Sequence, residues 1–141
     1  MSAPSPYASL FPGVDADEVF PRLYIGNAAS ATSPAFLADR GVTHVLNAAE
    51  GSATGFVDVH EDYYRSLGIS FLGLRLPDLP SANIGRHFEA VAEFIDSALT
   101  GGGTVLVNCL MGMSRSTTVV LAFLCIRRHR TVVEALTLVG D

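Results

Sequence analysis

The sequence predicts an α/β domain with a central mixed, mainly parallel sheet of about five strands flanked by helices. Short apolar segments rich in β-branched residues alternate with segments of helical periodicity along the 141 residues. Parallel strands need a crossover between them, usually a helix, so this alternation favours a mainly parallel sheet. The length is that of one domain, and an apolar content of 49% is sufficient for one sizeable core.

Four short segments have the composition of strands. β-branched and other apolar residues dominate them, and glycines or loop residues bound them. They are residues 22–26, 42–48, 69–74 and 104–108. The polar, acidic stretch of residues 51–62 between the second and third strands is predicted to be a loop.

Two helices are predicted in the first hundred residues. The first has Ser33 as N-cap and Pro34 at its first position, and it stops at Gly41. The second is capped by Asn83 and ends at the glycines of residues 101–103. Its apolar residues recur at spacings of four and three and so share one face. They are Ile84, Phe88, Val91, Ile95 and Ala98.

Two further helices follow the last strand. Residues 116–129 are strongly apolar and should lie at the centre of the core, with Cys125 among the core residues. The arginines at the end of this helix are expected to form a solvated helix end or to dock an acidic partner. Residues 131–138 begin one more helix.

The predicted domain covers residues 16–141. Residues 1–15 contain three prolines and three serines and are expected to form a flexible N-terminal tail. No internal repeat divides the rest of the chain. We therefore expect one domain and no second one.

The charge excludes several functions. The net charge is −5, which argues against nucleic acid as the main partner, because phosphate backbones require clustered cations. All nine basic residues are arginine, so lysine Schiff bases and Walker A phosphate loops are excluded.

The longest apolar run, residues 119–126, is far shorter than a membrane span. The N-terminus carries no basic residue before a short apolar run, so we expect no secretory signal and a cytoplasmic or nuclear protein of undetermined oligomeric state.

The cysteines and histidines do not suggest a metal site. Two cysteines are too few for a disulfide framework, and with four histidines they show no zinc-like spacing. The sequence therefore predicts free thiols, no metal and no cofactor.

The most informative segment runs from the strand of residues 104–108 into the helix after it. Cys109 follows the strand, and Arg115 and Ser116 begin the helix. Main-chain N–H groups at such a strand-to-helix turn point into one concavity and, with the helix dipole, attract an anion. The segment therefore predicts an anion site. The alternative is an ordinary buried cysteine beside a turn, with a solvated arginine.

Each residue type has a chemical reason to be there. A thiol at a helix N-terminus ionises readily, and a thiolate is a strong nucleophile. The planar guanidinium of Arg115 can grip a tetrahedral anion with two donors, which a lysine cannot reproduce. The hydroxyl of Ser116 can donate a hydrogen bond to the sulfur when it leaves in a second step.

These residues resemble a known family. The loop is similar to the Cys-x5-Arg signature of the cysteine-dependent protein tyrosine phosphatases, and Ser114-Arg115-Ser116 resembles the ending found in the atypical dual-specificity branch. The resemblance extends to about residues 17–139. It includes the opening of the branch (17–26), its second strand (41–49) and its acid loop with the helix that follows (64–96).

The resemblance implies a mechanism. The family hydrolyses phosphotyrosine, and in this branch also phosphoserine and phosphothreonine, through a cysteinyl-phosphate on the residue that matches Cys109. By family position Asp78 is the general acid; it lies between Pro77 and Pro80, 31 residues before Cys109. Residue type alone fits a solvated turn carboxylate equally well.

The resemblance also implies a phosphate-binding loop. Its backbone N–H groups would hold the phosphate oxygens, with Ser116 aiding departure of the sulfur. They belong to Leu110, Met111, Gly112, Met113, Ser114 and Arg115. The implied partner is a phosphorylated protein substrate, and no metal is needed.

Two departures from the family keep other functions open. The family usually has histidine before the nucleophile, where this chain has Asn108, so we expect a less acidic thiol and slower turnover. The family domain also continues past Asp141 with another helix, so the C-terminal helix is expected to be truncated and the apolar helix around residues 119–126 exposed. The alternatives are a catalytically weak pseudophosphatase that binds or scaffolds phosphoproteins, and a phosphatase for non-protein phosphates.

Overall fold

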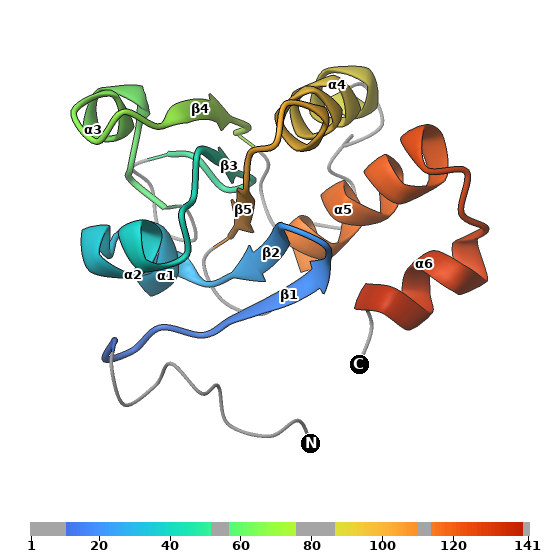
Figure 1. The fold of residues 1–141 in the computed structure, drawn as a ribbon, viewed down its shortest axis with the longest axis horizontal. Helices are drawn as coiled ribbons and strands as arrows, with labels where there is room; N and C mark the ends of the chain where they lie inside the picture. Colours follow the sequence, from blue (N-terminus) through green and yellow to red (C-terminus); the bar gives the residue numbers. More distant parts are fainter. Residues whose placement is uncertain (1–10, 52–56, 76–86, 110–113, 140–141) are drawn as a thin grey trace.

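A computed structural model describes residues 11–51, 57–75, 87–109 and 114–139 of the chain (Figure 1). The strands and helices of this part follow one another as the sequence predicts, with additions at three places. In chain order they are β1 (Ala16–Phe20), β2 (Leu23–Gly26), α1 (Ala28–Ala31), α2 (Pro34–Asp39), β3 (His44–Asn47), α3 (Glu61–Arg65), β4 (Ser70–Gly73), α4 (Phe88–Thr100), β5 (Val105–Asn108), α5 (Ser114–Arg127) and α6 (Val132–Val139).

The strands of the described residues form one mixed sheet in the order β1-β2-β5-β3-β4. Strands β2, β5, β3 and β4 are mutually parallel, and only the β1–β2 pair is antiparallel. The predicted mainly parallel five-stranded sheet is therefore confirmed. β1 was not predicted, because its polar residues Asp17 and Glu18 lie on an edge strand and hide the strand pattern.

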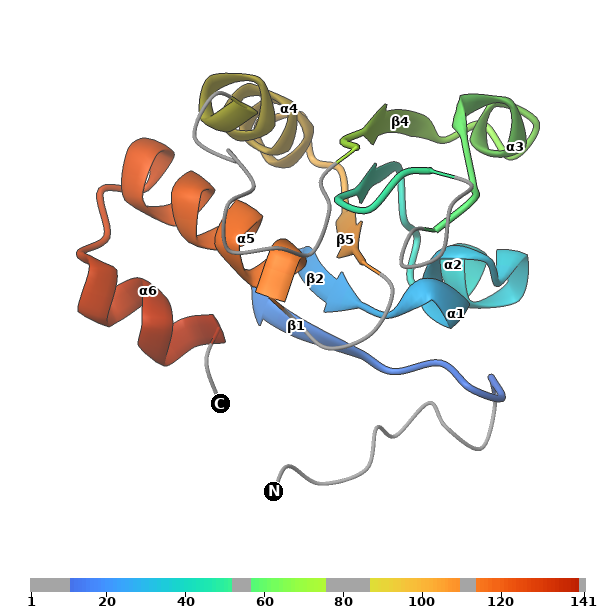
Figure 2. The ribbon, with the colours of Figure 1, turned by 180° about the vertical axis from the view of Figure 1, so that it is seen from behind.

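Helices cover both faces of the sheet (Figures 1 and 2). Successive residues of a strand point to opposite faces. In β5, Val105 and Val107 accordingly pack in the cluster with α4, α5 and α6, whereas Leu106 packs in the cluster with α2 and α3. The chain thus forms a three-layer α/β structure with an apolar core on each side of the sheet.

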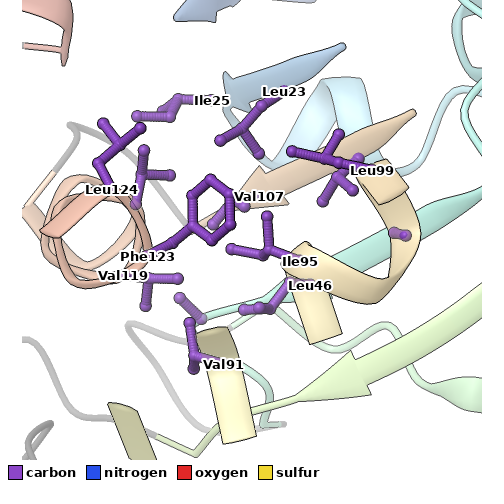
Figure 3. Close-up of a cluster of buried hydrophobic side chains, with 14 of the residues drawn as sticks. Leu23, Ile25, Leu46, Val91, Ile95, Leu99, Val107, Val119, Phe123 and Leu124 are labelled. Atoms are coloured by element: carbon purple, nitrogen blue, oxygen red, sulfur yellow. The ribbon is translucent and has the colours of Figure 1, made fainter. Parts of the chain in front are cut away.

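Helix α5 lies at the centre of the larger core, as predicted. Phe123 and Leu124 of α5 meet Ile95 of α4 and Leu23 of β2 in this cluster (Figure 3). The expectation that residues 119–126 would be exposed is wrong, since Val119, Val120, Phe123 and Leu124 are fully buried against the sheet and α4. The exposed apolar side chains at this end of the chain belong instead to α6 and are Val132, Val133, Leu136 and Leu138.

The helix boundaries follow local chemistry. Ser33 caps α2 by accepting a hydrogen bond from the Phe36 N–H at 3.2 Å, and Gly41 has the positive φ of 66° that ends the helix as predicted. Helix α4 begins at Phe88 with His87 as N-cap, and the predicted cap Asn83 lies outside the described residues. Helices α1 and α3 were not predicted; α3 lies partly in the predicted loop of residues 51–62.

The packed fold begins earlier than residue 16. Val14 is buried, and the ring of Phe11 meets the ring of Phe36 edge-on at 5.6 Å between centroids. These apolar contacts hold residues 11–15 against α2. Within the described part of the chain, no helix combines the length and the apolar character needed to cross a bilayer.

Candidate active site

The carboxyl ends of the parallel strands meet at one edge of the sheet. The register pairs Gly26 of β2 with Asn108 of β5, Asn108 with Asn47 of β3, and Asn47 with Gly73 of β4. Cys109 follows Asn108 and therefore leaves the sheet at the middle of this edge. Ligands of open α/β sheets bind outside the carboxyl ends of the strands, so this edge is the expected place for a site.

The thiol of Cys109 lies in a small buried apolar cluster at this edge of the sheet. Cys109 is 1% exposed and forms a small cluster with Ala49 and Val57, both also buried. The half-buried side chains of Ala28 and Val59 pack against this cluster. Cys109 forms no disulfide bond. The cluster thus places a thiol among small apolar side chains.

The first turn of α5 places two more of the predicted residues at the same edge. Helix α5 begins at Ser114, so Arg115 and Ser116 are its second and third residues, and they are 3% and 0% exposed. The unpaired main-chain donors of a helix N-terminus and its dipole favour an anion there. Among the described residues, the hydroxyl oxygen of Ser116 has no hydrogen-bond partner. A buried polar atom of this kind is suited to a ligand or to a step of the reaction.

A polar network supports the residue before Cys109. The side chain of Asn108 donates from Nδ2 to Oδ1 of Asn47 at 3.3 Å, and the Asn108 carbonyl accepts from the Ala48 N–H at 2.8 Å. Asn47 and Asn108 are both fully buried. In the sequence Asn108 stood out because the family usually has histidine at that position, whereas Asn47 did not stand out. In sequence Asn47 is one polar residue at the end of an apolar strand.

A charged cluster flanks this network. His60 contacts Oε2 of Glu50 through Nδ1 at 2.7 Å and Oδ1 of Asp58 through Nε2 at 2.5 Å, and Arg75 lies 3.8 Å from Glu50. The hydrogen bond to Glu50, then that to Asp58, raises the pKa of His60 above its ordinary value of 6.5. Sequence reasoning had assigned Asp58 to a solvated loop. Its partner is His60, two residues away.

The predicted site residues divide into two groups. Cys109 directly follows β5, and Arg115 and Ser116 lie in the first turn of α5. Ser114 is the first residue of α5. The proposed general acid Asp78 and the loop residues Leu110, Met111, Gly112 and Met113 lie outside the described residues.

Comparisons with known proteins agree with this fold. Residues 23–141 match the family model described as dual specificity phosphatase, catalytic domain. Dual specificity protein phosphatase 26 of Homo sapiens is 42% identical over 127 residues, which cover 89% of this chain. The match spans 58% of the length of that relative.

Solved structures give the same result. The human tyrosine phosphatase-like serine/threonine/tyrosine-interacting protein superposes with a TM-score of 0.77 at 29% identity, covering 89% of this chain and 82% of the other. A mouse protein described as a dual specificity phosphatase and complexed with zinc tungstate superposes with a TM-score of 0.76 at 28% identity, covering 99% and 78%. The family match covers more than half of the chain and includes the whole sheet from β2 onward. The chain therefore belongs to the dual specificity phosphatase catalytic domain family.

Proposed function

We propose that this domain is a protein phosphatase that hydrolyses phosphotyrosine, and also phosphoserine and phosphothreonine, through a cysteinyl-phosphate intermediate. The observation that carries the proposal is the position of a buried thiol outside any disulfide, Cys109, between the central strand β5 and the N-terminus of α5, with Arg115 in the first turn of that helix. Membership of the dual specificity phosphatase family supports the same chemistry.

In the first step the thiolate of Cys109 attacks phosphorus. The S–P bond forms while the bond from phosphorus to the substrate oxygen breaks, and Asp78 gives its proton to that leaving oxygen. The main-chain N–H groups of residues 110–115 and the guanidinium of Arg115 stabilise the charge that gathers on the phosphoryl oxygens. Protonation by Asp78 matters because an unprotonated alkoxide is a poor leaving group.

In the second step water attacks the phosphocysteine. Asp78, now a carboxylate, accepts a proton from that water, and the S–P bond breaks to release inorganic phosphate and the thiolate. The hydroxyl of Ser116 donates a hydrogen bond to the departing sulfur. Its lack of a partner among the described residues leaves it available for this role.

A phosphate-binding module without turnover is the second candidate. Asn108 favours it, because a neutral carboxamide before Cys109 cannot supply positive charge to a thiolate at any pH. The similar human structure is by its name a phosphatase-like, interacting protein. Such a module would bind phosphate analogues at the same edge without hydrolysing esters.

One assay separates these functions. Hydrolysis of a small aryl phosphate is measured for the unsubstituted chain, Cys109→Ser and the matched thiol control Cys125→Ser, each with and without vanadate. We expect hydrolysis by the unsubstituted chain and by Cys125→Ser, inhibition of both by vanadate, and no hydrolysis by Cys109→Ser. Vanadate binding without hydrolysis by the unsubstituted chain would favour the binding module. Hydrolysis that survives in Cys109→Ser would rule out the mechanism.

The substrate class and cellular place follow from the same chemistry. Phosphopeptides with phosphotyrosine, phosphoserine or phosphothreonine in one sequence context give the preference among the three directly. A nucleophilic thiol stays reduced only in a reducing compartment. We therefore place the protein in the cytoplasm or nucleus.

A further inference from the structure

The carboxamide of Asn47 uses all of its hydrogen-bonding capacity. Its Nδ2 donates to the carbonyl oxygens of Val57 at 3.1 Å and Val59 at 3.2 Å. Its Oδ1 accepts from the Ala49 N–H at 3.0 Å and from Asn108 Nδ2 at 3.3 Å. A carboxamide offers two N–H donors and an oxygen with two lone pairs, so four bonds satisfy it completely. The side chain is fully buried.

The partners of Asn47 surround the thiol. Ala49 and Val57 are the two buried residues that form the apolar cluster with Cys109, and Val59 packs against that cluster. Asn108 is the residue directly before Cys109. A main-chain hydrogen bond of 2.6 Å from the Val57 N–H to the Ala49 carbonyl also joins these two residues to each other. One side chain thus connects the end of β3, the end of β5 and residues 57–59 beside this sulfur.

We propose that Asn47 is a positioning residue for the Cys109 thiol. Its hydrogen bonds hold Asn108, Ala49 and Val57 in place, and these residues lie directly beside the thiol. The proposal rests on the proposed role of Cys109 as nucleophile. In this proposal Asn47 does not contact the substrate phosphate. It determines the position of the Cys109 sulfur relative to the N-terminus of α5. Displacements of about 1 Å at a reacting atom can lower a rate a hundredfold, so such a clamp matters for turnover.

No other side chain supplies the same four bonds in the same space. Aspartate has the shape of asparagine but lacks both donors, so it would turn an oxygen toward the carbonyls of Val57 and Val59. Glutamine is one methylene longer, and leucine has no polar atom. Asn47→Asp is therefore the sharpest test, because it changes the hydrogen bonds and the charge without leaving a cavity.

The experiment uses the full chain with Cys125→Ser, so that Cys109 is the only thiol. The rate of Cys109 alkylation by iodoacetamide is followed against pH, and aryl phosphate hydrolysis is measured on the same samples. In Asn47→Asp we expect the midpoint of the alkylation profile to rise by about half a pH unit or more, because loss of the two donors to Val57 and Val59 releases Asn108 and lets the sulfur move away from the main-chain donors at the N-terminus of α5, which favour the thiolate. We also expect kcat to fall about tenfold or more with KM changed less than about threefold.

Val45→Ala is the matched control. Val45 is buried in the same strand and packs in the cluster with α2 and α3, which does not include Cys109. It loses stability through a cavity and should leave the alkylation midpoint where it is. An unchanged midpoint in Asn47→Asp, or an equal shift in Val45→Ala, would overturn the proposal.

A measurement on the chain with Asn47 intact does not depend on the folding of any variant. In NMR spectra, the side-chain amide resonances of Asn47 should shift with pH along the same curve as Cys109 alkylation. The reason is that Asn47 is hydrogen-bonded to Asn108, Ala49 and Val57, which lie directly beside the thiol. Resonances that stay fixed through that curve would also overturn the proposal. Failure of the proposed phosphatase function is recognised separately, as absent hydrolysis with a normal alkylation profile.

Discussion

The hydroxyl of Ser116 shows how function and stability separate at a single residue. It is fully buried, and its oxygen has no hydrogen-bond partner within the described ranges. Burying a hydroxyl without a partner costs free energy that an apolar side chain of the same size would not cost. In the proposed mechanism the same hydroxyl donates a hydrogen bond to the sulfur as negative charge returns to it when the S–P bond breaks.

Ser116→Ala should therefore keep the fold and lose turnover. We expect a free energy of unfolding that is unchanged or higher by up to about 1 kcal/mol, measured by urea denaturation. A hydrogen bond to a charged group contributes about 1.5–3 kcal/mol, so kcat should fall about tenfold to a hundredfold. A variant that loses both stability and activity in proportion would show that the hydroxyl is structural.

At the scale of elements, helices α4 and α5 are joined by ion pairs that the sequence did not predict. Arg127 of α5 lies 3.6, 3.2 and 3.4 Å from carboxylates of α4, and Arg128 lies 2.5 Å from one of them. The carboxylates of α4 are Glu89, Glu93 and Asp96. The arginines were expected to be solvated or to dock a partner, because nothing in the sequence indicates that the acidic face of α4 lies opposite.

Asp96 lies at the centre of this network. Its hydrogen bond with Arg128, followed by the charges of Arg128 and Arg127, lowers the pKa of its carboxyl below the ordinary 3.8. A carboxyl with a lowered pKa in the folded state stabilises the fold above its unfolded pKa, and that stabilisation is lost as the pH falls through the folded value.

Asp96→Asn should lower the free energy of unfolding by about 0.5–1 kcal/mol at neutral pH, since partly exposed pairs contribute little more. Urea denaturation at neutral pH and near pH 2 measures this, and the two proteins should converge at the lower pH. The difference should also shrink in about 1 M salt because of screening. Glu89→Gln is the control, because Glu89 is largely exposed and, within the described ranges, its one ion-pair partner is Arg127. Equal losses in both variants would contradict the central place of Asp96.

The parallel strands and longer helices could be predicted from sequence, and several functional contacts could not. Strands such as β3 and β5 are buried on both faces of the sheet, and adjacent apolar residues form the middle of each strand. β1 instead lies at the edge of the sheet and carries acidic residues. Helices α1 and α3 have four and five residues, too few to show a period. Cys109, Arg115 and Ser116 stood out because they are close in sequence. The bond between Asn47 and Asn108 joins residues 61 positions apart, which no local pattern indicates.

At the scale of the whole molecule, the charged cluster around His60 is expected to make the free energy of unfolding depend on pH. His60 bridges Glu50, which follows β3, and Asp58, which precedes α3, and Arg75 after β4 faces the same carboxylate of Glu50. The two carboxylates raise the pKa of His60, Glu50 contributing most. A histidine with a raised pKa in the folded state stabilises the fold fully below its unfolded pKa of about 6.5, and this stabilisation is lost as the pH rises through the folded value.

His60→Gln should therefore flatten the dependence of stability on pH. When the pH is raised from about 6 to about 9, the urea concentration at the unfolding midpoint should decrease more for the unsubstituted chain than for the variant. His129→Gln serves as the control, because His129 is exposed at the end of α5. Parallel pH profiles for the unsubstituted chain and His60→Gln would contradict this role.

The measurement that tests the central claim most directly is acid quenching during turnover of an aryl phosphate, followed by mass spectrometry of the peptides that contain each cysteine. The account predicts a phosphate adduct on the Cys109 peptide and none on the Cys125 peptide, with a larger amount in Ser116→Ala because that variant breaks the S–P bond more slowly. Hydrolysis of the ester with no phosphate on Cys109 in either protein would contradict the proposed nucleophile.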